Sequence, residues 1–177
     1  MKIKTIYTTL CALLLISFTN VLMAQDIFSA SRLNDMITLV KLLKRNIKID
    51  TIDQRGYTPL IIAVYNESEA AAMLLLKNGA DPNAKDMSGN TALMGACYKG
   101  YLNMVKYLCE YKANLNQQNY NAATALIFAS TFGREDIVRY LLLNGAQKNI
   151  KDRFGNTALD YAVNQENDQI VEILKRE

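Results

Sequence analysis

The chain has 177 residues, of which half are hydrophobic and 21% are charged, a composition typical of one ordinary globular domain. It contains no histidine, so the commonest general base and the commonest metal ligand are both missing. The formal net charge is +3, and without Lys2 and Lys4 the count falls to 18 basic against 17 acidic residues. This balance argues against a surface that binds nucleic-acid phosphates, and we expect no nucleic-acid partner.

The first 24 residues have the layout of a secretory signal peptide. Two lysines precede an apolar stretch at residues 10–18 (LCALLLISF), and the small residue Ala24 closes the segment. We expect cleavage after Ala24 and a location in the periplasm or outside the cell, with no membrane contact beyond this signal. The alternative is an uncleaved membrane anchor, although the apolar stretch is short for a span of about 20 residues.

A period of 33 residues organises the chain from residue 53 onwards. The positions that recur without an insertion are Asp53, Asp86, Asn119 and Asp152; Gly56, Gly89, Ala122 and Gly155; Thr58, Thr91, Thr124 and Thr157; and Leu60, Leu93, Leu126 and Leu159. A repeat of this length is typical of solenoids, in which each unit packs on its neighbours.

Each unit predicts a turn followed by two short helices. Asp and Gly at the start of the unit favour a tight turn, and the Thr that follows can cap the first helix. Glycines after the first helix separate it from a second, expected at residues 102–111 and 136–143 in two of the units. Gly79 and Gly145 are expected to end the second helix as C-caps.

Segments such as DQRGYTPLIIAV and NGAQKNIKDRFGNTALDYAV resemble ankyrin repeats, which have a β-turn and two antiparallel helices in each unit. The resemblance implies an all-α solenoid of about five helix-turn-helix units with short β-turn connections. We assign a degenerate N-terminal capping repeat to residues 25–52 and a C-terminal capping repeat to residues 152–177. The complete repeats between them cover residues 53–85, 86–118 and 119–151.

Some positions depart from the family pattern. The histidine that usually follows TPL is replaced by Ile61, Met94, Ile127 and Asp160. Hydrogen bonds between neighbouring turns must therefore come from Thr or be absent. Lys112 stands where Gly79 and Gly145 stand, which predicts strain or an altered helix end. Asn119 and Ala122 make the turn of the third complete repeat the least standard.

Residues that could support catalysis or metal binding are few. Cys97 and Cys109 are expected at the ends of an antiparallel helix pair that lie apart, whereas a disulfide requires Cα atoms within about 7 Å. We expect two buried thiols, no metal site and no cofactor. Carboxylate pairs such as Glu135 with Asp136 fall at helix starts, where negative charge is stabilising. A hydrolase or redox role for the cysteines is the enzymatic alternative, but no catalytic motif supports it.

The resemblance instead implies a binding surface. In ankyrin arrays, the turn tips and the exposed side of the first helices form a concave face that binds proteins. The residues of this face expected to contact a partner are Arg55, Tyr57, Tyr65, Met87, Tyr98, Lys99, Tyr120, Phe132, Arg153 and Phe154. Tyr and Arg are frequent at binding hot spots. The alternative is that several of the rings pack between neighbouring repeats.

We therefore expect an exported, monomeric binding module of a bacterial kind, without enzymatic activity, that holds a protein partner on its concave face. One alternative is a structural or stress-protective scaffold of the cell envelope, which would have several weak partners. Another is an immunity-type protein that neutralises a toxin.

Overall fold

The computed structural model describes residues 27–176, and every regular element in this range is a helix. The first pair comprises helical residues 27–32 and α2 (Met36–Lys44). The pairs that follow are α3 (Pro59–Tyr65) with α4 (Glu69–Lys77), α5 (Ala92–Lys99) with α6 (Leu102–Glu110), α7 (Ala125–Thr131) with α8 (Glu135–Leu143), and α9 (Ala158–Asn164) with α10 (Asp168–Arg176). The predicted all-α solenoid is confirmed. The predicted signal peptide and its cleavage after Ala24 lie outside the described residues.

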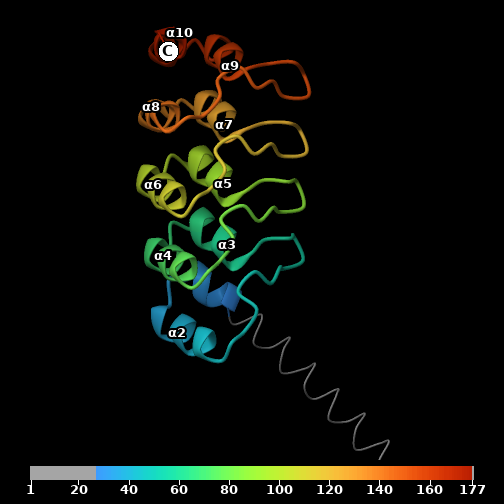
Figure 1. Cartoon of the computed structure of the whole chain (residues 1–177), viewed down its shortest axis with the longest axis vertical. Coiled ribbons are helices and arrows are strands. Elements are labelled where there is room, and N and C mark those ends of the chain that lie inside the picture. The colour runs from blue at the N-terminus through green and yellow to red at the C-terminus, as the bar shows by residue number, and fades with distance from the viewer. Residues whose placement is uncertain (1–26, 177) are drawn as a thin grey trace, which may run out of the picture.

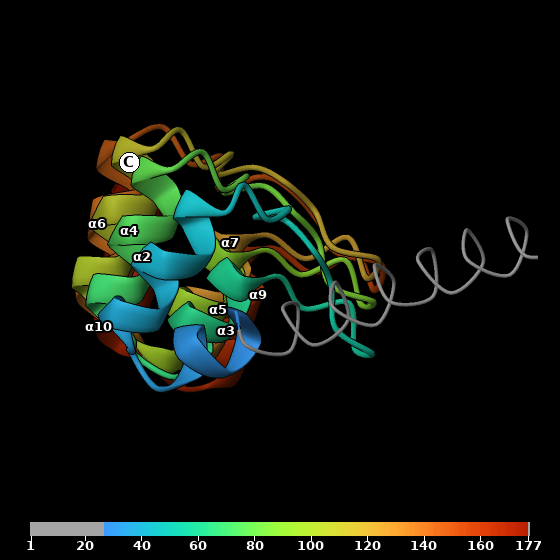
Figure 2. The ribbon, with the colours of Figure 1, turned by 90° about the horizontal axis from the view of Figure 1, so that it is seen from below.

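The helix pairs stack along the long axis of the molecule in two columns (Figure 1). The first helices of the pairs form one column, in which α3 packs on α5, α5 on α7, and α7 on α9. The second helices form the other column. Long loops at residues 45–58, 78–91, 111–124 and 144–157 join the pairs, and all extend to the same side (Figure 2). We call the side where the loop tips meet the exposed ends of the first helices the concave face.

Small residues allow the first helices to approach one another closely. The aligned alanines Ala63, Ala96, Ala129 and Ala162 are completely buried. Each second helix contributes a larger side chain to the same core, in the aligned positions Leu75, Leu108, Leu141 and Leu174. Since these side chains pack between successive pairs, the core is continuous along the stack, as expected for a solenoid.

The predicted turns and the Thr caps at the starts of the first helices are confirmed, whereas the C-cap residues of α4 and α8 are Asn78 and Asn144, each one residue before the predicted Gly79 and Gly145. Asp86 Oδ1 accepts hydrogen bonds from the backbone amides of Ser88 and Asn90, both at 2.8 Å. Asn119 Oδ1 makes the same pair of bonds in the next loop, because an amide oxygen can replace the carboxylate as acceptor. The hydroxyl of Thr91 accepts from the amide of Met94 and so caps α5.

Every positive φ angle in residues 27–176 falls at one of three positions of the repeat. These positions are Asn34, Glu67, Gly100, Gly133 and Glu166; Asn46, Gly79, Lys112 and Gly145; and Gly56, Gly89, Ala122 and Gly155. Lys112 has a φ of 65° and Ala122 a φ of 58°, so both residues adopt the backbone of the glycines that they replace. Of the two outcomes predicted at Lys112, an altered helix end is absent, because its amide donates to Cys109 as those of the aligned glycines do to Leu76 and Leu142, and the positive φ indicates strain instead.

The bonds between neighbouring turns differ from our expectation. The Thr hydroxyls accept from amides of their own helices, as Thr58 does from Ile61. The loops are linked instead by backbone amides: Tyr120 N–H donates to the Ser88 carbonyl at 3.1 Å, and Arg153 N–H donates to the Asn121 carbonyl at 2.9 Å. Backbone groups can form these links whatever side chain follows TPL, so the loss of the family's histidine leaves the loops joined.

Candidate functional site

The loop tips carry a row of strongly exposed apolar side chains on the concave face. Met87, Tyr120 and Phe154 are 66%, 68% and 67% exposed, and they lie on three successive loops. Lys85 Nζ lies 5.7 Å from the centroid of the Tyr120 ring, and the Arg153 guanidinium lies 4.6 Å from that of Phe154. The backbone links between loops fix the spacing of this row, so the rings are presented to solvent in a defined order.

A second group of candidate residues lies where the first helices end. Tyr98, near the end of α5, meets Phe132, just after α7, edge to face with ring centroids 4.6 Å apart. Each ring is 41% exposed, so the contact leaves part of both available to a partner. The Arg134 guanidinium donates to the Tyr98 carbonyl at 3.1 Å and so ties the two helix ends together. Lys99 is exposed beside Tyr98.

Tyr57 and Tyr65 are placed differently from the other candidate rings. They stack with centroids 5.7 Å apart, and both are half-buried against the core. Tyr65 also packs over Gly95 of the next unit, where an added Cβ would lie 3.2 Å from the ring. Burial raises the pKa of Tyr65 to about 12. Tyr65 therefore packs between units, which is the alternative considered for part of the aromatic series, and Tyr57 stacks on it within the same unit.

A cleft of about 910 Å³ opens at the N-terminal end of the concave face. Its lining comes from the first pair, the first long loop, α3 and the end of α5. The lining residues are Phe28, Arg32, Ile52, Asp53, Gln54, Arg55, Tyr57, Ile62, Tyr65, Asn66 and Lys99. Four of the expected contact residues therefore line one cleft: Arg55, Tyr57, Tyr65 and Lys99.

Sequence reasoning missed the contribution of the first pair to this cleft. Arg32 precedes Tyr65 by one repeat of 33 residues and Tyr98 by two. It therefore occupies the position of the first helix that carries candidate contact residues in the next two units. Extending the alignment of contact positions back by one unit would have identified Arg32.

The two cysteines of the described chain are free thiols. Cys97 is buried, and burial raises its pKa strongly. Cys109 is half-buried and not buried as predicted, and partial burial raises its pKa to about 11. Both thiols are therefore protonated near neutral pH, which makes them poor nucleophiles.

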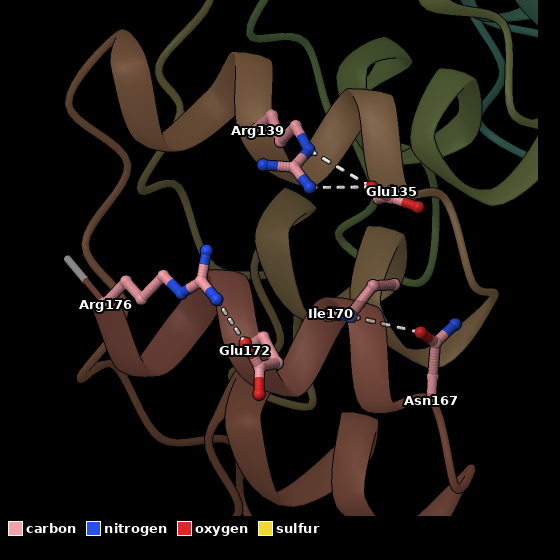
Figure 3. Close-up of polar contacts among 6 residues, drawn as sticks. All are labelled: Glu135, Arg139, Asn167, Ile170, Glu172 and Arg176. Atoms are coloured by element: carbon pink, nitrogen blue, oxygen red, sulfur yellow. Dashed lines mark hydrogen bonds and ion pairs between the residues drawn. The ribbon is translucent and has the colours of Figure 1, made fainter.

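The second helices carry charges that pair locally. Arg139 lies 2.8 Å from Glu135 within α8, and Arg176 pairs with Glu172 in the same way within α10 (Figure 3). Asn167 caps α10 by accepting from the Ile170 amide (Figure 3). Across residues 27–176, no group of His, Cys, Asp and Glu side chains is arranged to hold a metal ion. None of the helices in the same range is long and apolar enough to cross a membrane.

Comparison with known proteins adds one result. The family model described as ankyrin repeats in three copies matches residues 27–119, 75–152 and 113–177. These overlapping matches together reach from the first described helix to the last. No curated protein matches the chain.

Proposed function

The chain belongs to the ankyrin-repeat family, whose repeats generally mediate protein–protein interaction, and on this premise we propose that its concave face binds a protein partner. Ankyrin-repeat proteins are typically interaction scaffolds without enzymatic activity. The observation that carries the proposal is the row formed by Met87, Tyr120 and Phe154. Large apolar side chains that are exposed one after another along one surface are typical of interaction sites.

A rigid support favours binding by this row. Each tip lies on a loop that is closed by its own Asp or Asn and linked to a neighbouring loop through the backbone. The tips therefore lose little conformational freedom when a partner docks, which lowers the entropic cost of association. Cations beside the rings, such as Arg153 over Phe154, add polar groups to the same surface.

Affinity capture from the producing cells tests the proposal. The first bait combines Met87→Ala, Tyr120→Ala and Phe154→Ala, which removes the row of loop tips. The matched control combines Ile37→Ala, Val40→Ala and Leu143→Ala, which removes exposed apolar side chains of the second helices α2 and α8, outside the concave face. We expect the unmodified chain and the control to retain the same specific protein and the first bait to lose it. Equal capture by both variants would defeat the proposal, provided that circular dichroism shows equal helix content.

The partner is expected to meet the protein outside the cytoplasm. The lysines and the apolar stretch of residues 1–24 support export to the periplasm or the exterior. Mass spectrometry of the protein from its producing cells should then find an N-terminus at Gln25. An intact N-terminal segment on the protein would rule out a cleaved signal.

A further inference from the structure

We infer that the cleft at the N-terminal end of the concave face receives an acidic peptide segment of the partner, an inference that rests on the proposed function. The charged side chains that line the cleft are mostly basic. Arg32, Arg55 and Lys99 all line it, whereas its only acidic residue is Asp53. A segment rich in Asp and Glu is the complementary occupant.

The three cations reach the cleft from separate parts of the fold. Arg32 ends the first helical segment, Arg55 lies on the first long loop, and Lys99 ends α5. All three side chains are exposed. In residues 27–176, ion pairs occur within α8 and α10, so the three cations of the cleft are not neutralised by a partner. Separate units thus bring unpaired positive charge together at one place.

The Asp53 carboxylate forms hydrogen bonds within its own loop. Its Oδ1 accepts hydrogen bonds from the Arg55 amide at 2.8 Å and from the Tyr57 amide at 2.9 Å. This carboxylate therefore closes the turn, as the aligned residues do in later loops, and offsets only one of three positive charges. A net positive cleft with partly apolar walls concentrates the field that an anionic ligand experiences.

The apolar part of the lining indicates a peptide with side chains to bury. Phe28 is half-buried, Ile52 is exposed, and Tyr57 and Tyr65 form a stacked pair that is already ordered. These groups provide an apolar surface beside the cations. An acidic segment with an aromatic or aliphatic residue among its carboxylates would match both kinds of contact.

The charges along the concave face favour such a segment over nucleic acid. A phosphate backbone needs cations at regular intervals along its path. The tip of the third long loop, residues 117–124, contains no charged residue, so cations do not recur on every loop as a phosphate path would require. The cleft instead gathers three cations from separate units at one place, which suits a short acidic stretch of a folded or extended protein.

Selection from a random dodecapeptide library displayed on phage, with the full chain as bait, tests the inference. We expect enrichment of peptides that carry several Asp or Glu and at least one large apolar residue. Arg55→Glu with Lys99→Glu should weaken binding of these peptides about tenfold or more, because two attractions become repulsions. Lys77→Glu with Lys106→Glu is the matched control, because it makes the same charge change on exposed positions of α4 and α6.

The control should leave the affinity within about twofold, and added salt should weaken binding to the unmodified chain. Enrichment of neutral or basic peptides, no enrichment at all, or equal loss in both double variants would overturn the inference. The proposed function has a separate test, because capture through Met87, Tyr120 and Phe154 does not require charge in the cleft. If the partner is still captured but the peptide selection fails, the acidic-segment inference is rejected and the proposed binding face is retained.

Discussion

Backbone conformation at Lys112 links the repeat pattern to stability. The residue has a φ of 65° at a position where Gly79 and Gly145 have 89° and 92°. A residue with a side chain costs about 1–2 kcal/mol in this region, because its Cβ approaches the neighbouring backbone. The protein tolerates this cost since the helix pairs on both sides hold the turn in place.

Replacing Lys112 with Gly should therefore stabilise the protein. We expect the free energy of unfolding to rise by up to about 1 kcal/mol, since relief of strain exceeds the added freedom of the unfolded chain. Gly145→Ala is the converse control, because its Cβ would meet nothing within 4 Å and only the backbone strain would act. Urea unfolding of the three proteins measures both changes. A lower stability for Lys112→Gly would contradict the strain at this position.

Gly89 is required for a different reason, which is the close approach of the next loop. A Cβ at Gly89 would lie 2.7 Å from the Tyr120 backbone nitrogen and 2.8 Å from its ring. Gly155 has the same place in its repeat and a similar φ, but a Cβ there would meet nothing within 4 Å. Comparing substitutions at Gly89 and Gly155 therefore distinguishes the cost of a steric clash between loops from the cost of backbone strain alone.

Gly89→Ala should cost about 2–4 kcal/mol in unfolding free energy, and Gly155→Ala about 1 kcal/mol, because only the first adds a clash to the strain. Thermal or urea unfolding measures the difference. Equal losses in the two variants would show that the loops do not depend on close contact at Gly89.

At the level of elements, a ladder of polar side chains joins each unit to the next. Asn83 Oδ1 accepts from the Asn114 amide at 2.7 Å, and Asn116 Oδ1 accepts from the Gln147 amide at 2.8 Å. Asp50 makes the equivalent bond to the Asp81 amide at 3.1 Å. The recurrence of Asn at this position thus has a structural cause in the contact between units.

The last member of the ladder provides a control for its strength. Asn149 occupies the same position as Asn83, but no later unit in the described chain offers it an amide. Asn83→Ala should lower the unfolding free energy by about 1 kcal/mol, because the Asn114 amide loses its acceptor. Asn149→Ala should change it by less than about 0.5 kcal/mol. A similar loss in both variants would mean that the bond between units contributes nothing.

Much of this architecture could be predicted from local signals. The helices expected at residues 102–111 and 136–143 correspond to α6 and α8, since glycines mark their starts and apolar residues their buried sides. The loop links could not be predicted, because they join backbone groups about one repeat apart. Neither could the cleft, because Arg32, Arg55 and Lys99 come together only once the units have stacked.

The exposure of the candidate contact residues also could not be predicted from the sequence. Their period identifies which residues face the loop side, but it cannot tell an exposed ring from one that packs on the next unit. Tyr65 and Tyr98 hold the same place in successive repeats. Tyr65 is covered because Gly95 leaves room for its ring, whereas Tyr98 remains 41% exposed beside Phe132.

For the whole molecule, the two sides of the solenoid have different chemical characters. The column of second helices includes local ion pairs in α8 and α10. The concave face has exposed rings and a basic cleft. This separation leads to the central proposal that a protein partner binds on one side only.

Site-specific photo-cross-linking in the producing cells tests that proposal most directly. A photoreactive phenylalanine analogue replaces Tyr120 at a loop tip or, in the control, Leu143 at the end of α8, which is 78% exposed. We predict a discrete higher-mass adduct with one protein from position 120 and none from position 143. The same adducts from both positions, or an adduct from position 143 alone, would contradict binding through the concave face.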